Sequence, residues 1–259
     1  MTGECVRMRV GGITDMSTVD WYGNVALVLF FAGCNFRCPY CQNSGLIPLD
    51  SGSIVDMRYL EERIETGLRP VPQLDAVVFT GGEPLIQVNA VAEAAKVVKT
   101  HGLKLMLDTN GSIYSAVEKI LETGLVDRIA LDVKAPLNAE DYGHVSGVPE
   151  MGKKFSDSVR DTLMQCKSRG IEVEARTTVA PGVSDSPDFI ASIAKEIRGL
   201  TTAYYLQQFD NQGEVLSTEL KNKEPPKREQ MLSLARVALE AGVDPVFIKT
   251  RFEGLQRVN

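Results

Sequence analysis

The sequence is poor in the residues on which most metal sites and disulfide frameworks depend. Its 259 residues include two histidines, one tryptophan and five cysteines. An odd number of cysteines cannot pair completely, so we do not expect a secreted disulfide scaffold. Two histidines also provide little material for a histidine-based metal centre. The composition therefore favours a reducing compartment and directs attention to the cysteines.

Long hydrophobic runs and an excess of basic charge are also absent. No apolar stretch approaches the roughly 20 residues of a membrane-spanning helix. The first residues lack the basic flank and apolar core of a signal peptide. The net charge of -6 argues weakly against nucleic acid as the main ligand. With 44% hydrophobic and 24% charged residues, the chain has the composition of a globular protein. We therefore expect a cytoplasmic protein with neither a membrane nor a nucleic acid as its partner.

Three of the five cysteines lie close together. Cys34, Cys38 and Cys41 follow the apolar run 25–31, at spacings of four and three residues. Thiolates at such spacings can ligate three irons of a cubane iron–sulfur cluster and leave the fourth iron open. A structural zinc site usually has four ligands, and a ferredoxin-type carrier needs a fourth local cysteine. Because Cys5 and Cys166 are distant, an open-cornered cluster is the preferred interpretation, with zinc as the alternative.

Short apolar runs alternate with segments of helical periodicity from residue 25 onward. Val88, Val91, Ala95 and Val98, for example, fall at three- and four-residue spacings. We expect strands at 25–31, 75–79, 103–108, 127–133, 171–179 and 203–209, with one more possible strand at 245–248. We expect helices at 56–66, 87–101, 113–123, 156–169, 186–198 and 226–241. The stretches most typical of loops are 41–55, 135–155 and 210–226.

This alternation predicts an α/β fold with a parallel sheet and right-handed crossovers. Six strand–helix units are fewer than the eight that close a barrel, so we expect a partial, three-quarter β/α barrel at 25–250. An N-terminal extension at 1–24 with a strand-like segment at 6–10 precedes it, and a tail at 251–259 follows. Glycines that we expect to close helices in the left-handed conformation follow nearly every helix: Gly67, Gly102, Gly124, Gly170, Gly199 and Gly242.

Polar motifs stand where the predicted strands end, and catalytic groups of parallel barrels gather at that edge. The backbone at Gly81 and Gly82, with Glu83, could approach a ligand and accept hydrogen bonds from an ammonium group. Asp132 and Lys134 project to the same side of their strand. They form either a ligand-binding pair or a surface ion pair of little energetic value. The alternative for the motifs at 80–84 and 108–112 is an ordinary turn. For the segment that carries Arg176, the alternative is core packing followed by a Pro-Gly turn.

The pattern Cys34-x-x-x-Cys38-x-Tyr40-Cys41 resembles the signature of the radical S-adenosylmethionine (SAM) superfamily. The resemblance implies a 4Fe–4S cluster held by the three cysteines, with SAM on the open iron. Reductive cleavage of SAM would yield a 5′-deoxyadenosyl radical. It also implies a set of cofactor-binding residues at the strand ends: Tyr40, Gly81, Gly82, Glu83, Asp108, Thr109, Asn110, Asp132, Lys134, Arg176 and Gln207.

Within this superfamily the chain is most similar to the activating enzymes of glycyl radical enzymes. Asp132-x-Lys134, followed by Tyr142 and Ser146-Gly147, resembles their pattern, as does Arg176-x-Thr before a Pro-Gly turn. Many activases have histidine where this chain has Gln42. The resemblance is closest to archaeal-type activating proteins of anaerobic ribonucleoside-triphosphate reductase, and the cysteines are too few for auxiliary clusters.

The resemblance implies an oxidoreductase that removes a hydrogen atom from a glycine of a partner enzyme. Its electron donor would be a flavodoxin or a ferredoxin. One alternative is a radical SAM enzyme that acts on a small molecule or a modified nucleoside, as in deazapurine synthesis. The other is a non-catalytic iron–sulfur or zinc module. We expect Cys166 to lie in the core, and His101 and His144, the latter in a loop, to have no catalytic role.

Overall fold

The computed structural model describes residues 6–259, so Cys5 lies outside the described residues. Two compact units make up the fold. The first unit is formed by the described residues up to Asn35, by Gly45–Thr109 and by Ser115–Ile129. The second unit is formed by Phe36–Ser44, Asn110–Tyr114 and Ala130–Asn259.

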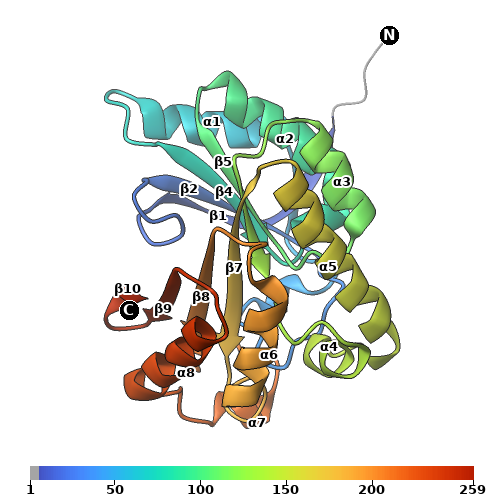
Figure 1. Ribbon diagram of the computed structural model, residues 1–259. Coiled ribbons are helices and arrows are strands. Elements are labelled where there is room, and N and C mark those ends of the chain that lie inside the picture. Colours follow the sequence, from blue (N-terminus) through green and yellow to red (C-terminus); the bar gives the residue numbers. More distant parts are fainter. Residues whose placement is uncertain (1–5) are drawn as a thin grey trace. The chain divides into compact units, whose positions relative to one another are not determined.

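The sheet of the first unit contains parallel strands flanked by an antiparallel pair (Figure 1). Its strand order is β5 (Lys104–Thr109), β4 (Ala76–Gly81), β2 (Ala26–Phe31), β1 (Arg7–Ser17) and β3 (Ser53–Asp56). Strands β2, β4 and β5 run parallel, whereas β1 is antiparallel to both β2 and β3. Nearly every residue of β2 is buried, as expected for a parallel strand that is covered on both faces.

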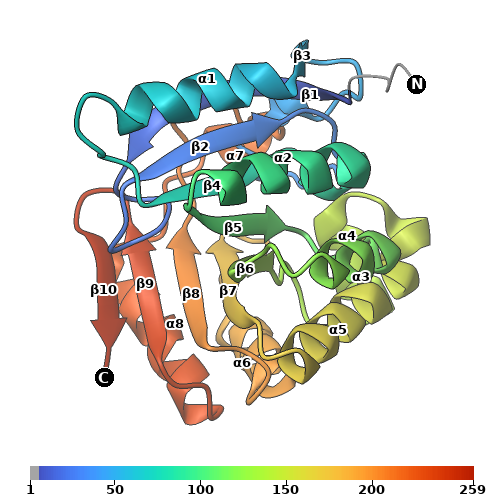
Figure 2. The same cartoon turned by 90° about the horizontal axis from the view of Figure 1, so that it is seen from above.

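Helices α1 (Met57–Leu68) and α2 (Val88–Thr100) lie side by side in the first unit (Figure 2), which also holds most of α3 (Tyr114–Glu122). The short 3₁₀ helices η1 (Ser44–Leu46) and η2 (Pro84–Gln87) follow β2 and β4. The buried positions of α2 recur at the predicted helical spacing: Ala90, Val91, Ala94, Ala95 and Val98.

The strands of the second unit begin with the last three residues of β6 (Arg128–Asp132). The order continues with β7 (Glu172–Val179), β8 (Ala203–Gln208), β9 (Val246–Thr250) and β10 (Gly254–Val258). Strands β7, β8 and β9 are parallel, and β10 runs antiparallel to β9. The register places Arg176 beside Tyr205, and Tyr205 beside Phe247.

Five α-helices belong to the described part of the second unit: α4 (Ala139–Ser146), α5 (Gly152–Ser168), α6 (Pro187–Ile197), α7 (Thr218–Lys221) and α8 (Arg228–Glu240). The 3₁₀ helix η3 (Pro149–Met151) joins α4 to α5. Helices α6 and α8 pack against each other, and α8 also packs on β8 and β9 (Figure 1). Cys166 is fully buried in α5, which confirms its prediction as a core residue.

All six predicted strands and all six predicted helices are present, and the possible strand at 245–248 is β9. The loop predictions were wrong in part, because the segments 41–55, 135–155 and 210–226 contain β3, α4 and α7. Helix α4 has only two turns, too few for a clear hydrophobic period. Its ends are nevertheless signalled. Asn138 accepts from the amide of Asp141, and Gly147 takes the left-handed conformation. His144 therefore lies in a helix, not in a loop.

The role predicted for Gly67 was also wrong. Gly67 lies inside α1 and has no positive φ, and the helix ends at Leu68 with Arg69 in extended conformation. A Cβ atom at position 67 would lie 2.4 Å from Cδ1 of Leu74. The glycine therefore leaves room for Leu74 to pack closely on the helix and does not close the helix. The other five predicted glycines do adopt positive φ.

Candidate active site

The cysteine loop begins directly after β2, and backbone hydrogen bonds hold its first residues. The amide of Gly33 donates to the carbonyl of Leu46 at 2.7 Å, and the amide of Cys34 donates to Ile47 at 3.0 Å. The amide of Glu83 in turn donates to the carbonyl of Gly33 at 2.7 Å. In the first unit, the end of β4 therefore lies directly against the start of the loop that carries Cys34.

Gly82 makes this close approach possible. A Cβ atom at position 82 would lie 2.2 Å from the carbonyl oxygen of Gly33, far inside contact distance. The same holds for Gly81, where a Cβ atom would meet the carbonyl oxygen of Phe31 at 2.3 Å. The sequence suggested that these glycines let a ligand approach the backbone. The structure shows that they let one segment of the chain approach another, and the ligand contact stays a prediction.

Glu83 connects the ends of two neighbouring strands. Its side chain is 1% exposed, and its Oε1 accepts hydrogen bonds from the amide of Leu85 at 3.0 Å and from Oγ1 of Thr109 at 2.8 Å. Because Leu85 belongs to η2 and Thr109 ends β5, one carboxylate fixes both segments. Asp108 is half-buried beside Thr109 on β5. The first unit thus brings Glu83 and Thr109 together through a direct hydrogen bond.

Asn110 starts a tight turn in the second unit. Its Oδ1 accepts from the amide of Ser112 at 2.9 Å and from the hydroxyl of the same residue at 2.6 Å. Such a side-chain turn is a common use of asparagine. Both residues are buried. Asn110 therefore has a structural role as well as its predicted contact with a cofactor.

The second half of the cysteine loop is anchored by α4 and by the segment before α7. The amide of Arg37 donates to the carbonyl of Ser146 at 2.6 Å, and a Cβ atom at Gly147 would lie 2.4 Å from the carbonyl oxygen of Arg37. On the other side, the amide of Leu216 donates to Cys41 and that of Ser217 donates to Pro39. The second unit therefore surrounds the segment from residue 37 to residue 41 with backbone contacts.

Lys134 lies beside Tyr40 in the second unit. Its Nζ is 2.8 Å from Oδ2 of Asp132 and 5.9 Å from the centre of the Tyr40 ring. Its backbone amide donates to the hydroxyl of Tyr142 at 3.3 Å. The prediction that Asp132 and Lys134 share one side of the chain is confirmed. The Lys134 side chain is 15% exposed and that of Asp132 is 38% exposed, so the ion pair is buried on its lysine side and open to solvent on its carboxylate side.

The charges around Lys134 keep it protonated. Burial by itself lowers the pKa of Lys134, but the hydrogen-bonded carboxylate of Asp132 leads the opposing contributions, which together hold that pKa well above its ordinary value. Burial also raises the pKa of the Tyr40 hydroxyl well above its usual range. In the metal-free chain, burial raises the pKa of Cys41, while Asn43 and then Lys134 oppose that rise. The segment therefore presents an ammonium group and a neutral phenol near two thiols.

Arg176 and Gln207 lie on strands β7 and β8 of the second unit. Nε of Arg176 is 2.7 Å from Oε1 of Glu174, and both side chains are about nine-tenths buried. Sequence reasoning missed Glu174, although Glu174-x-Arg176 is the same alternating signal that identified Asp132 and Lys134. Gln207 is half-buried and lies in register with Thr178 and Lys249. Nothing in the described contacts joins Arg176 directly to Gln207.

Two further observations concern the residue after the cysteine loop and a group of residues on the surface of the first unit. Nε2 of Gln42 donates to the carbonyl of Asp210 at 2.7 Å, so the residue that departs from the activase pattern holds the loop after β8. Away from the cysteine loop, Glu61, Glu65 and His101 have ligand atoms within 4.8 Å of one another. This group lies on the accessible surface of α1 and at the end of α2, and we assign it no role in the site.

None of the helices in residues 6–259 has the length and apolar character needed to cross a membrane.

Comparison with known families decides the class of the protein. The model of the Radical SAM superfamily matches residues 28–192. The chain belongs to the radical SAM superfamily. Radical SAM enzymes use a 4Fe–4S cluster and SAM, so the cofactors expected from the sequence are confirmed.

Two relatives of this radical SAM chain have the names of activating enzymes. A Methanocaldococcus jannaschii protein, provisionally named a glycyl-radical enzyme activating enzyme, is 31% identical over 95% of this chain and 97% of its own length. The pyruvate formate-lyase-activating enzyme of Clostridium pasteurianum is 31% identical over 74% of this chain and 77% of its own length. The chain is therefore a radical SAM enzyme related to glycyl-radical enzyme activases, which act on protein substrates.

The solved structures confirm the fold. The radical SAM methyltransferase of Sphaerobacter thermophilus has a TM-score of 0.69 with 14% identity, over 88% of this chain and 67% of its own length. At that identity the likeness concerns the fold alone. The α/β partial barrel predicted from six strand–helix units is thereby confirmed.

The residues of the second unit fit the radical SAM cofactors. The hydroxyl of Tyr40 is buried and has no hydrogen-bond partner among the described residues. A buried hydroxyl without a protein partner is unfavourable, so this atom suits a polar group supplied from outside the chain. The soft thiol donors of Cys38 and Cys41 suit an iron–sulfur cluster and not a hard cation.

Proposed function

We propose that this radical SAM enzyme activates an anaerobic ribonucleoside-triphosphate reductase by removing a hydrogen atom from a glycine of that enzyme. One observation carries the activase part of the proposal, while the identity of the target rests on the resemblance of the sequence motifs to archaeal-type activating proteins. The similarity to a relative provisionally named an activating enzyme extends over 95% of this chain and 97% of the relative. Similarity over nearly the whole of both chains includes the segments outside the common radical SAM region at 28–192.

In this proposal Cys34, Cys38 and Cys41 would hold the cluster through three of its irons and would leave the fourth iron open for the methionine group of SAM. When bound, the cluster and SAM supply the 5′-deoxyadenosyl radical that removes the hydrogen atom. The remaining proposed cofactor contacts come from the strand ends: Tyr40, Gly81, Gly82, Glu83, Asp108, Thr109, Asn110, Asp132, Lys134, Arg176 and Gln207.

The charges of the second unit support particular roles within that set. Lys134 remains protonated because its neighbours hold its pKa well above the ordinary value, so its ammonium can bind a carboxylate. Asp132 keeps an acceptor for a ribose hydroxyl beside it. The pairing of Arg176 with Glu174 orients the guanidinium without adding net charge. Residues 25–250 form the catalytic barrel in this proposal, with 1–24 as an extension and 251–259 as a tail.

Reducing equivalents would come from a flavodoxin or ferredoxin in an anaerobic cytoplasm. The protein therefore has two macromolecular partners in the proposal, one that donates an electron and one that carries the glycine.

The experiment is anaerobic reconstitution with iron and sulfide, reduction, and assay with SAM in the presence and absence of the candidate reductase. We expect 5′-deoxyadenosine and a glycyl-radical signal in the electron paramagnetic resonance spectrum of the reductase. Cys38→Ala should remove the cluster absorbance and all SAM cleavage. Cys166→Ala is the matched control, because Cys166 is a buried core thiol of α5, and it should keep both.

Each result bears on the proposal in a defined way. Formation of 5′-deoxyadenosine without a glycyl radical in the reductase would assign the enzyme a different substrate, such as a small molecule or a nucleoside. Cleavage that survives in Cys38→Ala would refute the ligand assignment.

A further inference from the structure

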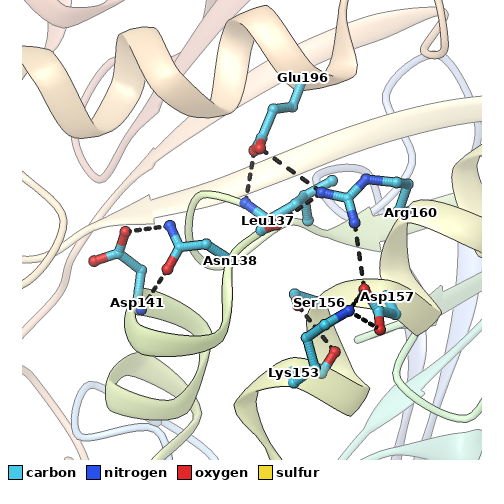
Figure 3. Close-up of polar contacts among 8 residues, drawn as sticks. All are labelled: Leu137, Asn138, Asp141, Lys153, Ser156, Asp157, Arg160 and Glu196. Carbon is cyan, nitrogen blue, oxygen red and sulfur yellow. Dashed lines mark hydrogen bonds and ion pairs between the residues drawn. The ribbon is translucent and has the colours of Figure 1, made fainter.

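The loop between β6 and α4 is held by side chains from two other helices. Leu137 lies three residues after Lys134, and both of its backbone polar groups are bound by charged side chains (Figure 3). Oε2 of Glu196 on α6 accepts from the amide of Leu137 at 2.6 Å. Nη2 of Arg160 on α5 donates to the carbonyl of Leu137 at 2.7 Å. We call Arg160 and Glu196 the Leu137 clamp.

The two residues of the clamp also contact each other, and one of them contacts a third charged residue. Arg160 and Glu196 approach each other to 3.9 Å, and Arg160 also lies 3.5 Å from Asp157 on its own helix (Figure 3). Leu137 itself is 5% exposed, so its amide and carbonyl have little access to solvent. Loss of either charged partner would leave a poorly solvated backbone group unpaired, which is costly.

The segment that the clamp fixes carries Lys134 at one end and α4 at the other. Before Leu137, the carbonyl of Val133 accepts from Oγ1 of Thr177 at 2.6 Å. After Leu137, Asn138 begins α4, whose Tyr142 hydroxyl accepts from the amide of Lys134. The end of α4 then accepts from the amide of Arg37 through Ser146. A displacement of Leu137 would therefore reach both Lys134 and the cysteine loop.

We propose that Arg160 and Glu196 are positioning residues that hold the segment 133–146 in the conformation that binds SAM. Neither side chain contacts Lys134, Tyr40 or a cysteine in the described interactions, so each acts through the backbone of Leu137. The inference rests on the proposed use of SAM. It adds two residues from α5 and α6 to a site otherwise built from strand ends.

The test compares SAM affinity in cluster-loaded protein for Arg160→Met, Glu196→Leu and Glu196→Gln. We expect Arg160→Met and Glu196→Leu to weaken SAM binding about three- to tenfold, because hydrogen bonds to charged groups contribute more than neutral ones. The iron content and cluster absorbance should stay at the wild-type level. Glu196→Gln keeps a side-chain oxygen that can accept from Leu137, so it should retain most of the affinity.

The matched control is Lys153→Met. Lys153 lies on the same helix as Arg160 and pairs with the same Asp157, at 2.7 Å, but its side chain is 75% exposed and does not contact Leu137 (Figure 3). This change should leave SAM affinity unchanged. Hydrogen exchange provides a readout independent of activity. Amides in 133–146 should exchange faster in Arg160→Met and Glu196→Leu, while those of β7 and β8 keep their protection.

The possible failures can be distinguished. If Arg160→Met and Glu196→Leu bind SAM as tightly as wild type and protect 133–146 equally, the clamp has no positioning role. If Arg160→Met and Glu196→Leu speed up hydrogen exchange in β7 and β8 as much as in 133–146, the two residues stabilise the whole second unit. The positioning proposal is then also wrong. If the wild-type protein, loaded with its cluster, does not bind SAM, the proposed function fails instead. Should Glu196→Leu not fold, Arg160→Met and Glu196→Gln still decide the question.

Discussion

Replacement of Gly147 by alanine tests how α4 supports the cysteine loop. Gly147 has a φ of 69°, a left-handed conformation in which alanine is less stable by roughly 1 kcal/mol. The new Cβ atom would also lie 2.4 Å from the carbonyl oxygen of Arg37 and 2.9 Å from its Cβ atom. Such overpacking typically costs about 1–3 kcal/mol. We therefore expect Gly147→Ala to lower the free energy of unfolding by about 2–4 kcal/mol.

Gly170→Ala is the matched control. Gly170 also follows a helix and has a φ of 67°, but a Cβ atom there would have no neighbour within 4 Å. It should lose only the conformational part, about 1 kcal/mol. The assay is urea unfolding of the cluster-free protein, followed by iron analysis after reconstitution. We expect Gly147→Ala to bind less iron than Gly170→Ala, because relief of the contact moves Arg37 within the cysteine loop. Equal unfolding energies and equal iron contents in the two variants would refute this reasoning.

Two further predictions concern buried groups. Thr109→Val removes the hydroxyl that donates to Glu83 at 2.8 Å, and should lower the free energy of unfolding by roughly 1.5–3 kcal/mol. The control is Thr100→Val, because the Thr100 hydroxyl donates to a backbone carbonyl at the exposed end of α2. This change should alter the free energy of unfolding by less than about 0.5 kcal/mol. Similar losses in the two variants would contradict the stabilising role of the hydrogen bond between Thr109 and Glu83. Burial raises the pKa of Cys166 to about 12, so at pH 8 its thiol stays protonated and should resist alkylation until urea unfolds the protein. Mass spectrometry of the labelled peptides measures this, and rapid labelling of Cys166 in the native protein would contradict its placement in the core.

Most strands and helices of the fold could be predicted from local sequence patterns. The buried strands and the longer helices were predictable because their apolar residues repeat with periods set by backbone geometry alone. The same reasoning placed Asp132 and Lys134 on one side of the chain, and their ion pair confirms it. It also contained the signal for Glu174 beside Arg176, which was overlooked. Helix α4 was missed because two turns provide too short a period, although Asn138 and Gly147 mark its ends.

Contacts between distant segments were beyond the reach of sequence reasoning. Gly82 is itself a predicted ligand contact, yet its Cβ position is occupied by the carbonyl of Gly33, about fifty residues earlier. Gly147 and Arg37 lie over a hundred residues apart and still touch. The clamp on Leu137 combines residues from α5 and α6. No spacing rule connects such residues, because their proximity depends on how whole strands and helices pack.

The sequence by itself determined the chemistry of this protein. Three cysteines at fixed spacings, and polar motifs at the ends of periodic strands, are local properties that survive in a printed string of residues. The tertiary structure alone decided which residues support that chemistry. Support depends on backbone amides and carbonyls that meet across the fold and on glycines that leave room for them. Nearly every residue has the same amide and carbonyl, so the sequence does not show which of them will meet once the chain is folded.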